Sequence, residues 1–196
     1  MNNLFSNTAI DTTSLYRANF YRTNAYRTFN TKTHREDPIS QNMAFQMATG
    51  RIPDLREVCL ELADTFINNS APYSAMLFVP VLKRLQTLDR EQIKRLMKNP
   101  QTRHVLVSTD RFELVLNLWK PGKASEIHGH PGGGCVFKLL QGKLEELRYT
   151  PDHSPKLMAT SSLQSGDMAY IDNSIAYHQV GNPYGSPAIS IHAYLK

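Results

Sequence analysis

The spacing of hydrophobic residues changes near the middle of the chain. Between residues 53 and 97 they recur at intervals of three and four, which is typical of helices that bury one face. A first helix carries the apolar stripe Leu55, Val58, Cys59, Leu62, Ala63, Phe66 and Ile67. A second helical run is expected over 74–88. Asp89 and Gln92 form a capping box that predicts a third, short helix ending near Met97.

After Pro100 the pattern changes to the two-residue alternation of strands. Short extended segments are expected between turns rich in Gly, Pro, Asp and Asn. These segments are 105–107, 112–119, 125–130, 135–140, 144–149, 167–171, 176–180 and 188–195. Helices followed by many short strands predict a mainly β fold of the α+β kind, in which a helical segment precedes a small β-barrel.

Residues 1–50 differ from the rest in composition, because Asn, Thr, Tyr and Arg dominate and Tyr-Arg pairs recur every five residues. That period fits neither a helix nor a strand. We expect an N-terminal arm (1–50) that is flexible or lies across the barrel surface, a helical segment (51–99) packed on the barrel, and the barrel itself (100–196), with 51–196 forming one domain. Asp11 is the only acid before Glu36, so an organelle-targeting peptide is an alternative for the arm, whereas no apolar core marks a secretory signal.

Composition excludes several classes of protein. With 196 residues and 41% hydrophobic content, the chain can bury one sizeable core, and no apolar run approaches the length that spans a bilayer. The net charge of +5 is spread along the chain without a nucleic-acid-binding motif, so neither nucleic acid nor a membrane is expected as a partner. The two cysteines form no secreted disulfide framework and favour a reducing, cytoplasmic location, and Cys59 is expected to be a buried thiol. We expect a monomer.

His128 and His130 form the most informative pair in the sequence. They alternate on a segment predicted to be extended, so both imidazoles should point to one side and could bind one metal ion. The surrounding frame is Gly122-x5-His-x-His-x4-Cys135-x6-Gly142. This frame resembles the first signature of the cupin superfamily, with Cys135 at the position of the usual glutamate.

A second cupin-like signature follows at Gly166 and His178-x3-Asn182, although its histidine comes one residue late. The resemblance implies a cupin jelly-roll barrel in which His128, His130 and His178 bind the metal. Three histidines with cysteine at the glutamate position are similar to the thiol dioxygenases, and to cysteine dioxygenases most of all. The likeness extends from about residue 101 to 194 and includes Thr102-Arg103, Phe112, Trp119, 137–142, 169–171, Ser174-Ile175 and 190–194.

The resemblance implies an iron-dependent oxidoreductase of cysteine metabolism that adds both atoms of O2 to the sulfur of L-cysteine or a close small thiol, giving a sulfinic acid. Three neutral imidazoles leave a divalent ion with its full charge and with open positions, which favours a soft, anionic thiolate ligand. Fe(II) is expected because zinc has no redox chemistry. The alternatives are a dioxygenase for 3-mercaptopropionate or another small thiol such as cysteamine, and a non-catalytic metal-binding cupin.

Cys135 and Tyr194 match the two residues that cysteine dioxygenases join by a thioether bond, so the resemblance implies a Cys135-Tyr194 crosslink. An unmodified thiol on the inner wall is the alternative. Ser190, His192 and Tyr194 alternate with apolar residues and should share one face of a strand. There Ser190 is expected to orient His192, and His192 to hydrogen-bond the Tyr194 phenol. The family's Ser-His-Tyr row implies catalytic roles for them, whereas by itself His192 could simply satisfy a buried hydroxyl.

Arg103 is expected to bind the substrate carboxylate, because guanidinium offers a planar, bidentate grip. It matches the Thr-Arg of cysteine dioxygenases, whereas 3-mercaptopropionate dioxygenases usually carry glutamine there; a solvated or structural arginine is the alternative. Three departures from the family bear on the substrate. Gln101 replaces a tyrosine, the sequence stops just after Tyr194, and the loop 131–134 places flexible glycines beside the metal.

The other polar residues considered are expected to have structural roles and not to belong to the site. A turn is expected at Asp172 and Asn173. Surface positions are expected for His34, His104 and His153. The solvated face of a strand is expected for Lys143, Glu145, Glu146 and Arg148.

Overall fold

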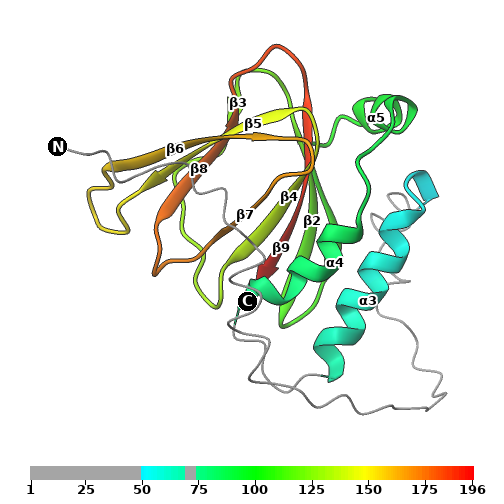
Figure 1. Ribbon diagram of the computed structural model, residues 1–196, viewed down its shortest axis with the longest axis horizontal. Coiled ribbons are helices and arrows are strands. Elements are labelled where there is room, and N and C mark those ends of the chain that lie inside the picture. The colour runs from blue at the N-terminus through cyan, green and yellow to red at the C-terminus, as the bar shows by residue number, and fades with distance from the viewer. Residues whose placement is uncertain (1–49, 69–73) are drawn as a thin grey trace. The chain divides into compact units, whose positions relative to one another are not determined.

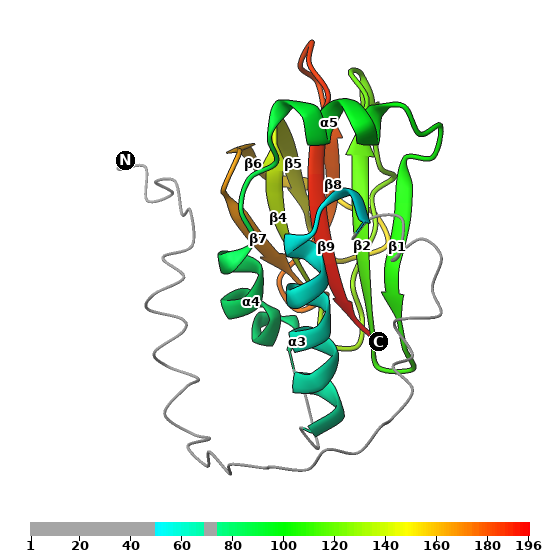
Figure 2. The same ribbon diagram turned by 90° about the vertical axis from the view of Figure 1, so that its right-hand side faces the viewer.

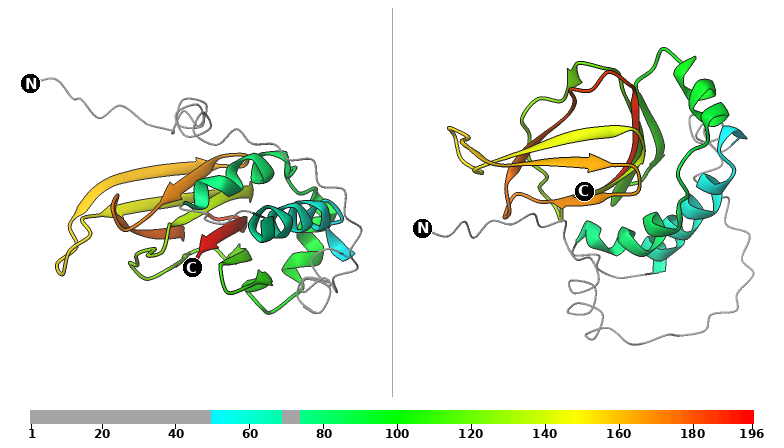
Figure 3. Two further views of the ribbon diagram at one scale, coloured as in Figure 1. Left: turned by 90° about the horizontal axis from the view of Figure 1, so that it is seen from below. Right: turned by 45° about the horizontal axis from the view of Figure 1, so that its top comes forward.

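The computed structural model describes residues 50–68 and 74–196, and most of these residues lie in two antiparallel β-sheets (Figure 1). The first sheet has the order β1 (Arg103–Ser108), β2 (Phe112–Trp119), β9 (Ala188–Leu195), β4 (Cys135–Gln141) and β7 (Met168–Ile171). The second has the order β3 (Lys123–Ala124), β8 (Tyr177–Asn182), β5 (Lys143–Tyr149) and β6 (Leu157–Gln164). The two sheets face each other as a small barrel, which confirms the predicted mainly β, jelly-roll fold (Figure 3).

Helices precede the barrel and cover the outer face of the first sheet (Figure 2). They are α3 (Asp54–Asn68), the 3₁₀ helix η1 (Ala75–Phe78), α4 (Val79–Arg84) and α5 (Arg90–Met97). The predicted capping box is present, since Asp89 accepts from the Gln92 amide and Gln92 accepts from the Asp89 amide. No helix in the described ranges is long and apolar enough to cross a bilayer. Residues 1–49, which make up nearly all of the expected arm, lie outside the described residues.

Three details differ from the expected elements. The segment 125–130 is not a strand, because after β3 only His128 pairs, in a single bridge with His178. Strand β6 was not predicted, because most of its apolar residues gather at its start and do not alternate with polar ones, and most of its side chains are exposed. The helical run 74–88 is divided into η1 and α4, and it ends at Arg84 where Leu85 becomes extended.

The five-stranded sheet separates the core into an outer and an inner part. Outward residues of β2 and β9 pack in one apolar cluster with residues of the helices. The strands contribute Leu114, Leu116, Leu118, Ile189, Ile191 and Ala193, and the helices contribute Leu55, Cys59, Leu62 and Phe78. The alternate residues of the same strands face the barrel interior. The β2–β9 pairing places Glu113 opposite Tyr194, Val115 opposite His192 and Asn117 opposite Ser190. The interior therefore receives polar side chains from both central strands.

Lys138 anchors α4 to the sheet. It is buried on the helix-facing side of β4, and its Nζ donates to the carbonyls of Leu82 (3.0 Å), Lys83 (3.1 Å) and Leu85 (2.6 Å). Burial lowers the pKa of this lysine. The end of α4 thus has its free carbonyls satisfied by one cation, which accounts for the position at which the helix stops.

We expect Lys138→Met to lower the free energy of unfolding by about 2–3 kcal/mol, because methionine fills the space but leaves buried carbonyls without donors. Thermal and urea unfolding would measure the loss. Lys143→Met, at an exposed position that starts β5, is the matched control and should change stability by less than about 0.5 kcal/mol. Equal stability of the two variants would contradict the anchoring role.

Candidate metal centre

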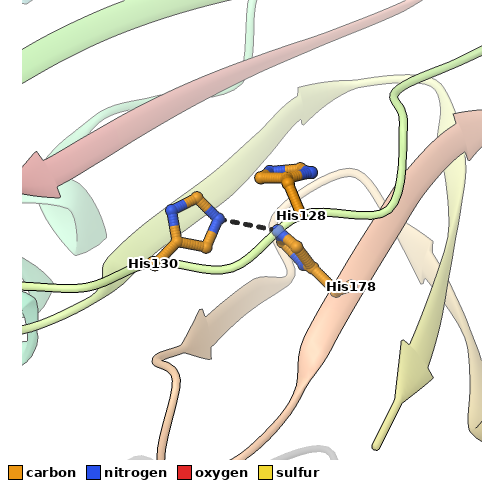
Figure 4. A group of neighbouring side chains, drawn as sticks. All are labelled: His128, His130 and His178. Carbon is orange, nitrogen blue, oxygen red and sulfur yellow. Dashed lines mark hydrogen bonds between the residues drawn. The ribbon is translucent and has the colours of Figure 1, made fainter. Parts of the chain in front are cut away.

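Three histidines converge inside the barrel (Figure 4). His178 lies on β8, and His128 and His130 come from the segment after β3. Reciprocal backbone hydrogen bonds join His128 to His178, from His128 N to His178 O (2.9 Å) and from His178 N to His128 O (2.8 Å). One potential ligand atom from each residue lies within 4.8 Å of the others. The structure therefore brings together the three side chains that the sequence selected as ligands.

The donor set fits a divalent transition metal. His130 Nε2 and His178 Nε2 are 2.9 Å apart, close to the roughly 3 Å expected for two nitrogens bound at about 2.1 Å to one ion at right angles. Burial, with the neighbouring imidazoles adding to it, lowers the pKa of His130 to about 3, and burial also lowers the pKa of His128. Neutral rings keep a free lone pair for a metal. Within residues 50–68 and 74–196 no carboxylate or thiol joins this group.

Glu146 fixes the orientation of His178. Its Oε1 lies 2.8 Å from His178 Nδ1, and its Oε2 accepts from Arg148 Nε at 3.0 Å. Burial alone would raise the pKa of Glu146, but the hydrogen bond to His178 and the charge of Arg148 outweigh it and hold the pKa below its usual value. The carboxylate thus binds the Nδ1 side of the ring and leaves Nε2 facing the other histidines.

The interpretation of Glu146 as part of a solvated strand face was wrong, because its side chain is buried. Glu146 shares the inward face of β5 with Leu144, two residues earlier, and that alternation was the signal that could have identified it. The surface position expected for His104 was also wrong, since His104 is buried with Nε2 3.1 Å from the Gln101 carbonyl. His153 is exposed as expected, and His34 lies outside the described residues.

The surroundings of Gly129, next to His130, leave no space for a residue larger than glycine. The Asn173 side chain accepts from the His130 amide at 2.6 Å. A Cβ at Gly129 would lie 2.3 Å from Asn173 Oδ1 and 2.7 Å from a Tyr177 ring carbon. The turn expected at Asp172 and Asn173 is present, and through Asn173 it positions the backbone of His130, a role that the sequence did not indicate.

The glycine loop beside the histidines is held in place by hydrogen bonds. Gly132, Gly133 and Gly134 all have positive φ, which explains why glycine is needed there. The Gly133 carbonyl accepts from the Ala75 amide (2.8 Å) and from the Tyr170 hydroxyl (3.2 Å). The Leu195 amide donates to the Gly134 carbonyl at 3.0 Å. These glycines therefore permit a defined turn beside the histidines.

Cys135 and Tyr194 are direct neighbours across β4 and β9. Directly opposite residues have Cβ atoms about 5 Å apart. Cys135 is fully buried, and burial raises the pKa of both its thiol and the Tyr194 phenol. The Tyr194 ring centre lies 5.5 Å from that of His130. The pair therefore forms a wall next to the three histidines.

His192 is held by a chain of hydrogen bonds. Trp119 Nε1 donates to Ser190 Oγ at 2.7 Å, and Ser190 Oγ lies 2.7 Å from His192 Nε2, so the serine proton is directed to the ring. His192 Nδ1 faces the Cys135 sulfur at 3.9 Å. The expected Ser190–His192 contact is present, but both ring nitrogens are engaged and the Tyr194 phenol instead bonds the side chain of Asn117.

Arg103 forms an ion pair with Glu113, with Nη2 and Oε2 2.5 Å apart. Arg103 pairs with Asn117 across β1 and β2, and Glu113 lies opposite Tyr194. The arginine side chain is 54% exposed, whereas that of Glu113 is 20% exposed. The family motif predicted that Arg103 binds a substrate carboxylate, but it did not indicate that the chain supplies a carboxylate of its own.

Burial of neutral histidines predicts that the metal-free protein is acid-sensitive. Burial is the main cause that lowers the pKa values of His104, His128, His130 and His192. In the unfolded chain histidine titrates near 6.5, so below that pH the unfolded state binds more protons and stability falls as the pH falls. Each such histidine adds up to about 1.4 kcal/mol per pH unit.

Urea unfolding of the metal-free protein between about pH 7.5 and 5.5 would measure this slope. His104→Gln should reduce it, because it removes one buried ring outside the metal centre, while His153→Gln at an exposed position should not. A free energy of unfolding that stays constant over this range would contradict the prediction.

The match to a known family covers most of the described barrel. Residues 77–196 match the model of the family described as cysteine dioxygenase type I. Cysteine dioxygenase type 1 of Homo sapiens is 37% identical over 89 residues, which are 43% of this chain and 44% of that protein. The Danio rerio protein of the same name is 38% identical over 90 residues, or 43% and 45%. The match thus spans less than half the length of these relatives.

Among solved structures, the TT1209 protein from Thermus thermophilus superposes with a TM-score of 0.41 and 24% identity, over 53% of this chain and 93% of that chain. A cupin 2 conserved barrel domain protein from Salinispora arenicola gives a TM-score of 0.40 and 20% identity, over 58% and 88%. The family match includes all three histidines, Cys135 and Tyr194. The chain belongs to the cysteine dioxygenase type I family.

Proposed function

We propose that the protein is an iron-dependent thiol dioxygenase that acts on L-cysteine or a close small-thiol analogue, with His128, His130 and His178 as the metal ligands. The observation that carries the proposal is the convergence of three imidazoles with no carboxylate among the donor side chains of the described residues. Such a donor set leaves the ion's positive charge uncompensated, which favours a thiolate.

The reaction balances without another reductant. A thiol and O2 give a sulfinic acid: the O–O bond breaks, two S–O bonds form, and sulfur loses the four electrons that O2 gains. Iron(II), when bound, would supply the redox chemistry that zinc lacks. The protein's own residues bind and orient the thiol and exclude water. In this proposal Arg103 holds the substrate carboxylate, and Ser190 and His192 keep the wall beside Cys135 and Tyr194 in position.

A Cys135-Tyr194 thioether is part of the proposal. The cross-strand pairing of the two residues and the burial of the thiol support it. Joining Sγ to a ring carbon breaks one S–H and one C–H bond and releases two electrons and two protons, which reduce one O2, the oxidant that the proposed reaction already uses, to hydrogen peroxide. Mass spectrometry of iron-loaded protein after turnover should show a peptide pair linked with the loss of two hydrogens. We also propose a cytoplasmic monomer whose barrel spans 100–196, with a helical segment over 51–99.

Anaerobic iron loading followed by oxygen uptake with L-cysteine tests the function. We expect one O2 consumed per sulfinate formed, and no uptake without thiol. Stoichiometric zinc or nickel in the isolated protein, combined with no thiol-dependent uptake after iron reconstitution, would instead favour a non-catalytic metal-binding cupin.

A further inference from the structure

A negative charge lies on the inward face of β2, beside the wall where a small thiol would dock. Glu113 pairs with Tyr194 in the sheet, and Tyr194 pairs with Cys135 on its other side. The Tyr194 ring in turn lies 5.5 Å from His130. Glu113 is therefore one strand away from Tyr194, the ring that lies beside His130.

The ion pair between Glu113 and Arg103 is unequal in its exposure. About four-fifths of the Glu113 side chain is buried, whereas more than half of the Arg103 side chain is exposed. The carboxylate is thus the inner partner, and the long arginine side chain approaches it from the solvent side. A ligand entering the barrel meets a fixed carboxylate and a guanidinium whose charge is already balanced.

This arrangement discriminates between charged thiols. A thiol that carries only a carboxylate must compete with Glu113 for Arg103 and is repelled by Glu113 itself. A thiol with an ammonium group gains Glu113 as an acceptor. If it also carries a carboxylate, the five N–H donors of Arg103 are enough to bind both carboxylates.

We propose that Glu113 is a specificity-determining residue that makes this pocket select small thiols bearing an ammonium group over thiols bearing a carboxylate alone. The inference rests on the proposed thiol-binding function and adds the class of substrate. Opposite charges in a partly buried site support a preference of roughly tenfold to a hundredfold.

Anaerobic calorimetric binding to the iron-loaded protein tests the inference with three probes: cysteamine, L-cysteine and 3-mercaptopropionate. The wild type should bind the first two at least about tenfold more tightly than the third. Glu113→Gln should weaken cysteamine binding and strengthen 3-mercaptopropionate binding, reducing the ratio about tenfold or more. Glu113→Asp keeps the charge and should restore the wild-type order. Glu145→Gln on β5 is the control and should leave all three affinities unchanged.

Unchanged selectivity in a folded Glu113→Gln protein would overturn the inference, as would equal affinity of the wild type for all three probes or no binding of any. If Glu113→Gln does not fold, selectivity that is lost in Glu113→Asp would also overturn it. Oxygen uptake is recorded separately. Binding that prefers thiols with an ammonium group, without oxygen uptake, would reject the dioxygenase function and keep the role of Glu113. Oxygen uptake together with the same selectivity in the wild type and in Glu113→Gln would reject the role of Glu113 and keep the dioxygenase function.

Discussion

His178→Ala should abolish iron loading and thiol-dependent oxygen uptake together. His178 supplies one of three donor atoms and is joined to His128 through the backbone and to His130 through a 2.9 Å contact between ring nitrogens. Its removal leaves two imidazoles and a buried carboxylate, Glu146, without its ring partner. Two ligands do not hold a divalent ion in the face of competing water. Metal analysis after anaerobic reconstitution and an oxygen electrode would measure the two losses.

His153→Ala is the matched control, because this histidine is exposed and lies outside the cluster. It should load iron as the wild type does. Circular dichroism of metal-free His178→Ala should show that the barrel still forms, so that lost loading reflects a missing ligand. A folded His178→Ala protein that loads one iron per chain or consumes oxygen with L-cysteine would remove the basis of the proposed site.

Glu146→Gln should weaken metal binding about tenfold to a hundredfold while leaving the fold intact. Glutamine preserves shape and an acceptor for His178 Nδ1, but it removes the negative charge that makes the imidazole a better donor. It also removes the ion pair with Arg148. Competition with a coloured chelator would give the dissociation constant of the metal for each protein.

Glu145→Gln removes a charge from the adjacent position of the same strand, which faces the other way, and should not change metal affinity. An affinity of Glu146→Gln within about threefold of the wild type would show that the carboxylate is not needed to orient the ring, since such partners usually matter by tenfold or more. The hydrogen bond would then serve packing alone.

The sequence predicted the architecture where alternation is strong and failed where it is weak. The bounds of β2 and β9 agree with the segments predicted over 112–119 and 188–195, because their outer residues are apolar and their inner residues differ. Strand β6 carries little apolar pattern and was missed. The segment 125–130 was wrongly taken as a strand, although the single bridge of His128 with His178 still brings His128 and His130 into the cluster.

For the site, the motif identified residues but not their partners. The spacing of the histidines selected the cluster, while Glu146 and Asn173 were not recognised because their roles depend on which strands and turns meet in space. The same limitation applies to Arg103. Its match to a family motif predicted a substrate-binding guanidinium. The register of β1 and β2 places Asn117, not Glu113, opposite Arg103, and only the side-chain ion pair shows that Glu113 reaches it.

The hydrogen bond from the Ala75 amide to the Gly133 carbonyl links the start of η1 to the loop that precedes Cys135. A shortened protein beginning at β1 would lose this hydrogen bond. It would also lose the α4 carbonyls that accept hydrogen bonds from Lys138. The excised barrel would then hold its histidines beside an unanchored turn. The helical segment before β1 thus helps to position the histidines although it contributes no histidine to the cluster. Removing this segment should reduce metal affinity even though every strand remains.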